Sequence, residues 1–281
     1  MKKFFVSVAL LLWAGILTAQ SKERIKGNRQ VVTKVYTLKP FHSIEFAEDL
    51  RVQLKQASGE ESLELRADEN LHEVLVWEVN EGVLRLYTKK DIVRKRAFEI
   101  TIFVDKDLRS IKISETARIK SENKLKFNAL NIEMDHYAKA DLALIVSDTL
   151  RVNLKNKAVL ETDAEAPVVL LKLTDDAEVK GMISGKKMKV QADKTADFTL
   201  GGSMKYVELN LTDKAEFSGK KFFVKKAATV RLDKRANASL KGQSAGMEMF
   251  LRGKSHLHLA GDFNRYELKE FKDNASITRE P

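Results

Sequence analysis

Residues 207–217 read VELNLTDKAEF, and this stretch holds the pattern that decides the fold. Its first three apolar residues alternate with polar ones, which is the period-two signature of a strand with one buried face. A polar triplet, TDK, follows, and then a small residue, Ala215. A second apolar alternation begins at Phe217. The stretch therefore predicts two strands that are joined by a polar corner.

The same pattern returns about every 20 residues from roughly Ser110 to Ile277. The small residue recurs nine times, at Ala117, Ala138, Ala158, Ala177, Ala196, Ala215, Ala236, Ser255 and Ala275. A repeat of this length cannot bury its apolar face alone, so it predicts a solenoid of stacked coils. Nine coils at ~4.8 Å each would make the regular part ~40 Å long.

Two other repeat architectures fit the sequence less well. Leucine-rich repeats carry a fixed Asn or Cys motif and helical segments, and neither is present. Antiparallel hairpins favour Asn-Gly or Asp-Gly turns, whereas the linkers read TDD at 174–176, DKT at 193–195 and DKR at 233–235. The recurring Ala instead indicates a tight corner at which a methyl group is the most that fits.

Charged residues two positions before the small residue change sign from copy to copy. They are Asp175, Lys194, Asp213 and Lys234. If the coils stack in register, these side chains form a column of alternating charge, which is mildly stabilising between neighbouring strands. A mixed exposed surface would also arise in any chain with 32% charged residues. Either way, exposed pairs contribute only ~0–1 kcal/mol.

Residues 1–19 have the three parts of a secretory signal peptide. Lys2 and Lys3 precede an apolar run from Phe4 to Ile16, and the small residue Ala19 offers a cleavage site before Gln20. The apolar run is short for a membrane span and no second run follows. We therefore expect an exported chain, periplasmic or secreted in the cell envelope, with no transmembrane span after cleavage.

The composition narrows the class of protein further. There is no Cys, so the chain has neither disulfides nor the cysteine of a lipoprotein anchor. The net charge of +10 would suggest nucleic acid in a cytosolic protein, but export argues against that partner. The positive charges are scattered through the repeats, as on a solvated surface. Phospholipid head groups and acidic polysaccharide remain possible anionic partners.

The first third of the chain carries strand patterns without the strict repeat. Residues 20–30 are polar and are expected to be loosely ordered, and 31–109 is expected to form an irregular β region that continues into the solenoid at 110–281. The expected strands are Val31–Leu38, His42–Ala47, Leu50–Gln56, Ser62–Ala67, Val83–Tyr87 and Phe98–Val104. Residues 68–79 suggest either a short helical turn capped by Asp68 or an irregular crossover. The basic stretch Asp91–Arg96 suggests an exposed loop.

Several stretches in this region resemble a known family of exported proteins. The stretches are FHSIEF at 41–46, LRVQL at 50–54, LELRADENL at 63–71 and GVLRL at 82–86. Together with the later repeats, they resemble the putative auto-transporter adhesin, head GIN domain family over about Val31 to Ile277. The resemblance implies a right-handed parallel β-helix and a setting in the outer envelope, and it supplies no catalytic residues. No barrel-length set of strands follows the repeats, so we do not expect display by autotransport.

Clusters that could support catalysis or metal binding are sparse. His256 and His258 share one strand face, but a zinc site needs a third ligand, for which only Asp262 and Asp141 are candidates. Parallel β-helices that cleave acidic polysaccharides use clustered Asp, Ca²⁺ and a basic residue. The residues that could mimic them are Asp175, Asp176, Asp193 and Asp213 with Lys194 and Arg235. Their presence at corners favours a structural role, so we expect no catalytic residue, metal or cofactor.

The favoured interpretation is a non-enzymatic cell-envelope module, adhesin-like or structural, that contacts protein or glycan with its solenoid surface. A polysaccharide lyase or hydrolase and an envelope-stress scaffold or sensor partner are the alternatives; the oligomeric state stays open. The candidate contacts are Arg94, Lys95, Arg96, Tyr137 and Tyr206. Phe222, Phe223 and Tyr266 are further candidates for exposed aromatic contacts, whereas Phe198 and Phe217 are expected to stack inside the core, and Trp77 to be packed.

Overall fold

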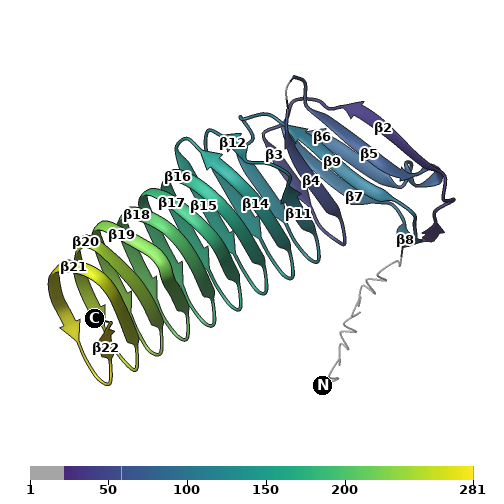
Figure 1. Cartoon of the computed structure of the whole chain (residues 1–281). Coiled ribbons are helices and arrows are strands. Elements are labelled where there is room, and N and C mark those ends of the chain that lie inside the picture. Colours follow the sequence, from purple (N-terminus) through teal and green to yellow (C-terminus); the bar gives the residue numbers. More distant parts are fainter. Residues whose placement is uncertain (1–21, 58, 281) are drawn as a thin grey trace, which may run out of the picture.

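The computed structural model describes residues 22–57 and 59–280, and it is a parallel β-solenoid with a sheet region at its N-terminal end (Figure 1). The predicted signal peptide lies outside the described residues. The strands of the N-terminal region are β1 (Arg24–Lys26), β2 (Val31–Thr37), β5 (Ser62–Asp68), β6 (Leu75–Asn80), β7 (Val83–Thr88), β8 (Asp91–Arg94) and β9 (Phe98–Val104). The coil strands are β3 (Ser43–Phe46), β4 (Arg51–Gln56), β10 (Ser110–Ile113), β11 (Arg118–Ser121), β12 (Leu125–Phe127), β13 (Leu130–Met134), β14 (Lys139–Val146), β15 (Thr149–Leu154), β16 (Val159–Leu173), β17 (Glu178–Ala192), β18 (Asp197–Leu211), β19 (Glu216–Leu232), β20 (Asn237–Leu251), β21 (His256–Phe271) and β22 (Ser276–Arg279).

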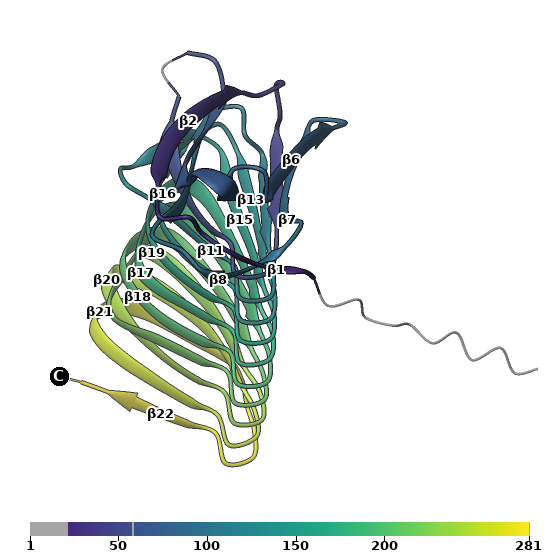
Figure 2. The same ribbon diagram turned by 90° about the vertical axis from the view of Figure 1, so that its right-hand side faces the viewer.

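Each coil has one tight corner, and the corners stack along one edge of the solenoid (Figure 2). We call the strands that lead into the corner the pre-corner face and the strands that leave it the post-corner face. From β16 to β21, one long strand begins on the post-corner face and bends into the pre-corner face of the next coil. Successive strands pair in parallel register, as in Leu209↔Val230 and Phe198↔Phe217. The predicted solenoid is confirmed.

The small residue of each repeat is buried at the corner, as predicted. The Ala residues from 117 to 236 and Ser255 are 0% exposed. At every described corner except that of Ala177, the amide of the small residue closes a four-residue turn, as in the bond from Ala215 N to Thr212 O at 3.2 Å. The neighbouring corners also bond to each other, with Lys214 N donating to Lys194 O at 2.7 Å. A residue in this position is therefore enclosed by backbone on its own coil and on both neighbours.

The residue two positions before the small one has a positive φ at every corner. The values are close to 60°, for example 65° at Asp175 and 56° at Lys194, and Gly253 takes the same place with 68°. Positive φ at the second turn position is typical of the primed turns, which usually rely on Gly, Asn or Asp. We did not predict this conformation, because most of these residues are not glycine. The bonds between coils hold it in place despite a cost of about 1 kcal/mol or more per residue.

The predicted column of alternating charge is also confirmed. Lys194 binds Asp175 of the preceding coil, and Lys234 Nζ lies 2.6 Å from Asp213 Oδ1. The hydrogen bond from Lys194 lowers the pKa of Asp175, and that from Lys234 lowers the pKa of Asp213. The column is thus built from two separate ion pairs, which are exposed and contribute little to stability.

The N-terminal region differs from the prediction in three places. Residues 24–26 form a strand, β1, and part of the expected basic loop forms β8, which pairs with it in parallel. The ambiguous segment 68–79 contains a 3-10 helix, Glu69–Leu71, and the strand β6, which pairs with β7. The apolar residues of β6 alternate over too short a stretch for the sequence to distinguish a strand from a turn. The region is otherwise the expected set of strands, with β5 antiparallel to both β2 and β9.

Asp68 does not cap the 3-10 helix. Its carboxylate is buried and accepts hydrogen bonds from three backbone N–H groups, those of Arg29, Arg96 and Ala97, at 3.0–3.2 Å. These amides belong to two segments that flank β5. Asp68 therefore fastens both the entry of the chain and the basic segment to the N-terminal sheet.

Within the described residues, no helix is long and apolar enough to cross a membrane.

Candidate binding surface

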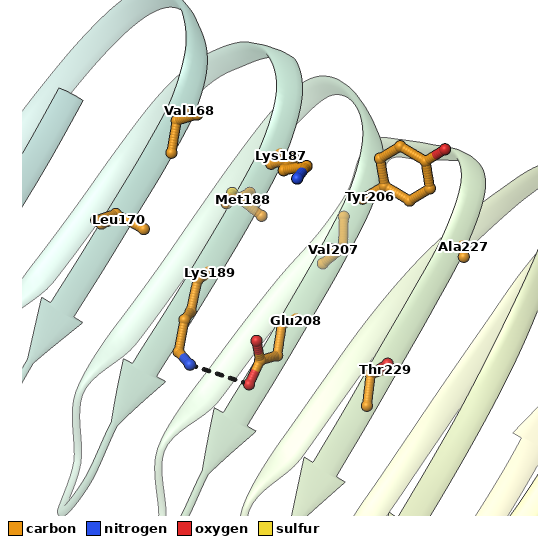
Figure 3. A pocket seen from close by; sticks show the side chains of 10 residues that line it. All are labelled: Val168, Leu170, Lys187, Met188, Lys189, Tyr206, Val207, Glu208, Ala227 and Thr229. Carbon is orange, nitrogen blue, oxygen red and sulfur yellow. Dashed lines mark ion pairs between the residues drawn. The ribbon is translucent and has the colours of Figure 1, made fainter. Parts of the chain in front are cut away.

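An open groove surrounds Tyr206 on the pre-corner face (Figure 3). Four consecutive long strands, β16 to β19, form it, and its volume is about 350 Å³. Tyr206 lies in one column of side chains with Val168, Lys187 and Ala227, because these residues are in register across the four strands. The Tyr206 side chain is 44% exposed. Its ring therefore stands at the surface with solvent on one side.

Small residues next to Tyr206 create the groove. The position in register with Tyr206 is Ala227 on β19 and Gly246 on β20. Neither residue carries a side chain long enough to cover the ring. A second hollow of about 200 Å³ continues over these residues to Arg265 and Glu267 on β21. The ring thus faces a shallow trough that crosses several coils.

Charged side chains line the floor of the groove beside the ring. Lys189 Nζ lies 3.2 Å from Glu208 Oε1, and Lys187 is exposed next to Tyr206 (Figure 3). A hydrogen bond from Asn210 and then the Lys189 ammonium lower the pKa of Glu208. The groove therefore offers an aromatic face, a cation and a fixed carboxylate within two coils. Such a mixture suits a polar ligand with an apolar side, since Tyr combines a ring with a hydrogen-bonding hydroxyl.

The other predicted contact residues lie elsewhere on the molecule. Tyr137 follows the positive-φ residue of an earlier corner and is 57% exposed, with Lys157 Nζ 5.8 Å from its ring centre. Arg94 ends β8 at the N-terminal end of the molecule, and Lys95 Nζ lies 5.2 Å from the ring centre of Phe98. The structure does not bring these residues to Tyr206, so the predicted contacts form separate patches.

Most aromatic residues fall into the predicted classes, but Phe222 does not, and Phe223 is only partly exposed. Phe198 and Phe217 are fully buried with ring centres 5.9 Å apart, as predicted for an internal stack. Phe222 was expected at the surface, but it is 0% exposed and packs edge-on against Phe217 at 5.8 Å. A register shift between Ser218 and Phe223 turns its ring inward. Tyr266 is 40% exposed.

Both histidine candidates and Asp262 have partners within the fold, whereas Asp193 Oδ1 is buried without a hydrogen-bond partner among the described residues. His256 Nδ1 lies 2.8 Å from Ser276 Oγ, and His258 Nδ1 lies 2.9 Å from Thr278 Oγ1 on the next strand. Asp262 accepts a hydrogen bond from Ser244 at 2.9 Å. Over residues 22–57 and 59–280, no three His, Cys, Asp or Glu side chains are arranged to hold a metal ion.

The sequence predicted Tyr206 as an exposed aromatic contact, and its exposure is confirmed, but the small residues that leave it exposed were not predicted. Ala227 and Gly246 look like ordinary small residues, and irregularities between Met204 and Tyr206 and between Val224 and Ala227 hide their alignment with it. Tyr206, Ala227 and Gly246 each lie nine residues before a corner residue, namely Ala215, Ala236 and Ser255. Counting back from the corners would therefore have placed the three residues in one column.

Comparison with known proteins agrees with the fold. Residues 40–262 match the family described as putative auto-transporter adhesin, head GIN domain. The chain belongs to this family. The resemblance seen in the sequence is therefore confirmed over most of the chain, and the family description names an adhesin. No curated protein matches the chain.

Solved structures of related shape come from Parabacteroides. A putative adhesin from Parabacteroides merdae has a TM-score of 0.71 and 16% identity, covering 88% of this chain and 100% of its own. A putative lipid binding protein from Parabacteroides distasonis has a TM-score of 0.68 and 17% identity, with the same coverage. At these identities the likeness shows that the three chains share a fold.

Proposed function

We propose that this head GIN protein is an exported, non-enzymatic binding module of the cell envelope that contacts a glycan or protein with the exposed surface of its solenoid. The observation that carries the proposal is the open groove at Tyr206, where a half-exposed ring lies beside Ala227 and Gly246. The family description, adhesin, points in the same direction.

The chemistry of the groove favours a glycan over a protein segment. A sugar presents C–H groups on one side and hydroxyls around its edge, which match the Tyr206 ring and the Lys189–Glu208 pair. The groove is open along the solenoid axis, so a chain of sugars can pass through it from coil to coil. Single contacts of this kind are weak, because each ordered polar group loses hydration when it binds.

Binding of the purified protein to envelope glycans and to whole-envelope extract tests this proposal. Tyr206→Ala should reduce retention at least tenfold, whereas Tyr87→Ala, which removes a ring of similar exposure (39%) on β7, should not. Gly246→Phe should also reduce binding, because the new ring would fill the trough. Unchanged retention in both Tyr206→Ala and Gly246→Phe would refute the groove as the contact site.

Export is tested separately from binding. Cleavage of the signal peptide should leave a chain that begins at Gln20. Mass spectrometry of the protein from the envelope fraction of an expressing bacterium reports that end directly. Recovery of the uncleaved chain from the cytoplasm would contradict the proposed location.

A further inference from the structure

One column on the post-corner face carries its charges in blocks of one sign. The column contains the first residue after each corner, and these residues are in register from strand to strand. From β4 to β19 they are Arg51, Arg118, Lys139, Val159, Glu178, Asp197 and Glu216, and the uncharged Asn237, then His256 and Ser276, follow on β20 to β22. Three cations are therefore followed by one neutral residue and then by three carboxylates.

Like charges on adjacent strands are destabilising. Charges alternate in the corner column of Asp175, Lys194, Asp213 and Lys234 and on part of the pre-corner face, although Glu248 and Glu267 are neighbours on that face. On that face Glu45 lies between Arg85 and Lys112, each at 3.1 Å. No ion pair within 4 Å involves Arg118, Lys139, Asp197 or Glu216 among the described residues. Arg51 and Glu178 do have such partners, Asp49 at 3.9 Å and Lys180 at 2.6 Å, so ion pairs within the chain offset the like-charge repulsion of the column only in part.

The effect of like-charge repulsion is seen in the acidic half of the column. Asp197 lies between Glu178 and Glu216 and receives one hydrogen bond, from Thr199 at 3.3 Å. Partial burial first, and then the two neighbouring carboxylates, raise its pKa. At the basic half, Arg51, Arg118 and Lys139 line an open groove of about 1020 Å³. The basic half therefore has room for groups of the opposite sign, and the acidic half carries negative charge at Asp197 and Glu216 that is unpaired among the described residues.

The order of charges is self-complementary. Consider a two-fold axis that is parallel to the strands and passes through Val159. Rotation about it generates a second copy whose post-corner face lies against the post-corner face of the first copy, with its coils in the reverse order. Arg51 then opposes Glu216, Arg118 opposes Asp197, and Lys139 opposes Glu178. In the neighbouring column the same operation places Asp141 opposite Lys180, which are again of opposite sign. On the axis strand itself, Glu161 and Asp163 each meet their own copy, and each has a cation nearby: Lys180 on the strand adjacent to Glu161, and Lys124 Nζ at 3.3 Å from Asp163.

We propose that two copies of this chain associate through their post-corner faces, with antiparallel solenoid axes and Val159 at the two-fold axis. Such a contact is isologous, the commonest arrangement in homodimers. Seven strands at ~4.8 Å and a face ~17 Å wide give an interface on the order of 1,000 Å² in total, which is the size of a weak and reversible dimer. Because opposed charges dominate the contact, salt should weaken it.

Charge reversal with compensation tests the register of this dimer. By sedimentation, the purified protein should dimerise reversibly at low ionic strength and dissociate at high ionic strength. Arg118→Glu and Asp197→Lys should each weaken association at least tenfold. Their combination should restore it, because the two positions face each other only across the interface and lie four coils apart within one chain. Lys172→Glu, an exposed change of equal charge on the pre-corner face, should leave association unchanged.

Three other outcomes would each overturn the proposed dimer. A protein that stays monomeric up to millimolar concentration at low ionic strength has no such interface. A dimer that the double variant fails to restore has a different register. If the monomer instead binds polygalacturonate beads in a manner that Arg118→Glu abolishes, the basic column is a site for an anionic glycan. Loss of self-association leaves the Tyr206 groove untouched, since it lies on the other face, so the two proposals fail separately.

Discussion

Replacing Ala196 by Leu tests whether the small residue determines how closely the coils stack. Ala196 is 0% exposed and lies between Ala177 and Ala215 of the adjacent coils. Backbone bonds fix the three corners to each other, with Asp197 N to Ala177 O at 3.0 Å and Glu216 N to Ala196 O at 2.9 Å. The three corners cannot move apart without breaking these hydrogen bonds.

The expected magnitude follows from the spacing. Adjacent coils lie ~4.8 Å apart, and carbon atoms in contact are already ~3.5–4 Å apart. A column of methyl groups therefore fills the slot to within ~1 Å, and Leu adds three carbon atoms to it. Overpacking of this kind costs about 1–3 kcal/mol. With neighbours on both sides we expect the upper end, about 3 kcal/mol, which corresponds to a fall in melting temperature of roughly 6–12 °C.

Thermal and urea unfolding of the purified protein measure the effect. Ala227→Leu is the matched control, because it adds the same atoms at an exposed position two coils away. It should change stability by less than about 0.5 kcal/mol. Ala196→Ser keeps the volume small but buries a hydroxyl, so it should cost about 1 kcal/mol. If Ala196→Leu unfolds like Ala227→Leu, the corner is not the tightly packed position that we describe.

Three further substitutions test single interactions. Ser255→Ala should stabilise the protein by about 1 kcal/mol in urea unfolding, because its buried Oγ has no hydrogen-bond partner among the described residues; a loss of stability would indicate a partner. Asp68→Ala should cost about 3 kcal/mol and increase amide exchange in residues 91–97, because three N–H groups lose a charged acceptor; unchanged exchange would contradict that role. The raised pKa of Asp197 means that the folded state holds its proton more tightly than the unfolded state, so stability should fall as the pH rises from about 3.8 through the folded pKa. In dilute monomeric protein, Asp197→Asn should abolish this loss of stability with rising pH and increase the free energy of unfolding by roughly 0.5–1 kcal/mol at neutral pH. If the stability of the variant depends on pH as that of the wild type does, the carboxylates do not repel each other as described.

The regular part of the fold follows from the sequence because each position in a coil has one environment. Alternation of apolar and polar residues determines which side chains enter the core, and the recurring Ala marks the corner, so Phe198 and Phe217 could be placed correctly. The prediction is weaker where the repeat gains residues. The step from Ala215 to Ala236 is longer than its neighbours, and the extra residues form the register shift that buries Phe222.

The candidate sites depend on relations between coils, which a single repeat does not reveal. Tyr206 was identifiable as an aromatic residue at an outward position, but its exposure depends on Ala227 and Gly246, which lie one and two coils away. The charge order on the post-corner face appears only when residues about 20 positions apart are read as one column. The positive φ at each corner was not predictable from residue type, since Lys and Glu adopt it as well as Asp and Asn.

The two proposed surfaces have a joint consequence, because they lie on opposite faces of the same coils. When the post-corner faces pair, both pre-corner faces point outward, and the dimer presents two Tyr206 grooves. A groove that binds one glycan segment weakly would then bind a surface carrying many segments with an avidity higher by 10²–10⁴. Arg118→Glu, which leaves the groove intact, should therefore lower retention on a dense glycan surface without changing the affinity for a soluble fragment of the same glycan. Equal losses on the surface and in solution would show instead that Arg118 itself contacts the glycan, and the dimer would have no part in adhesion.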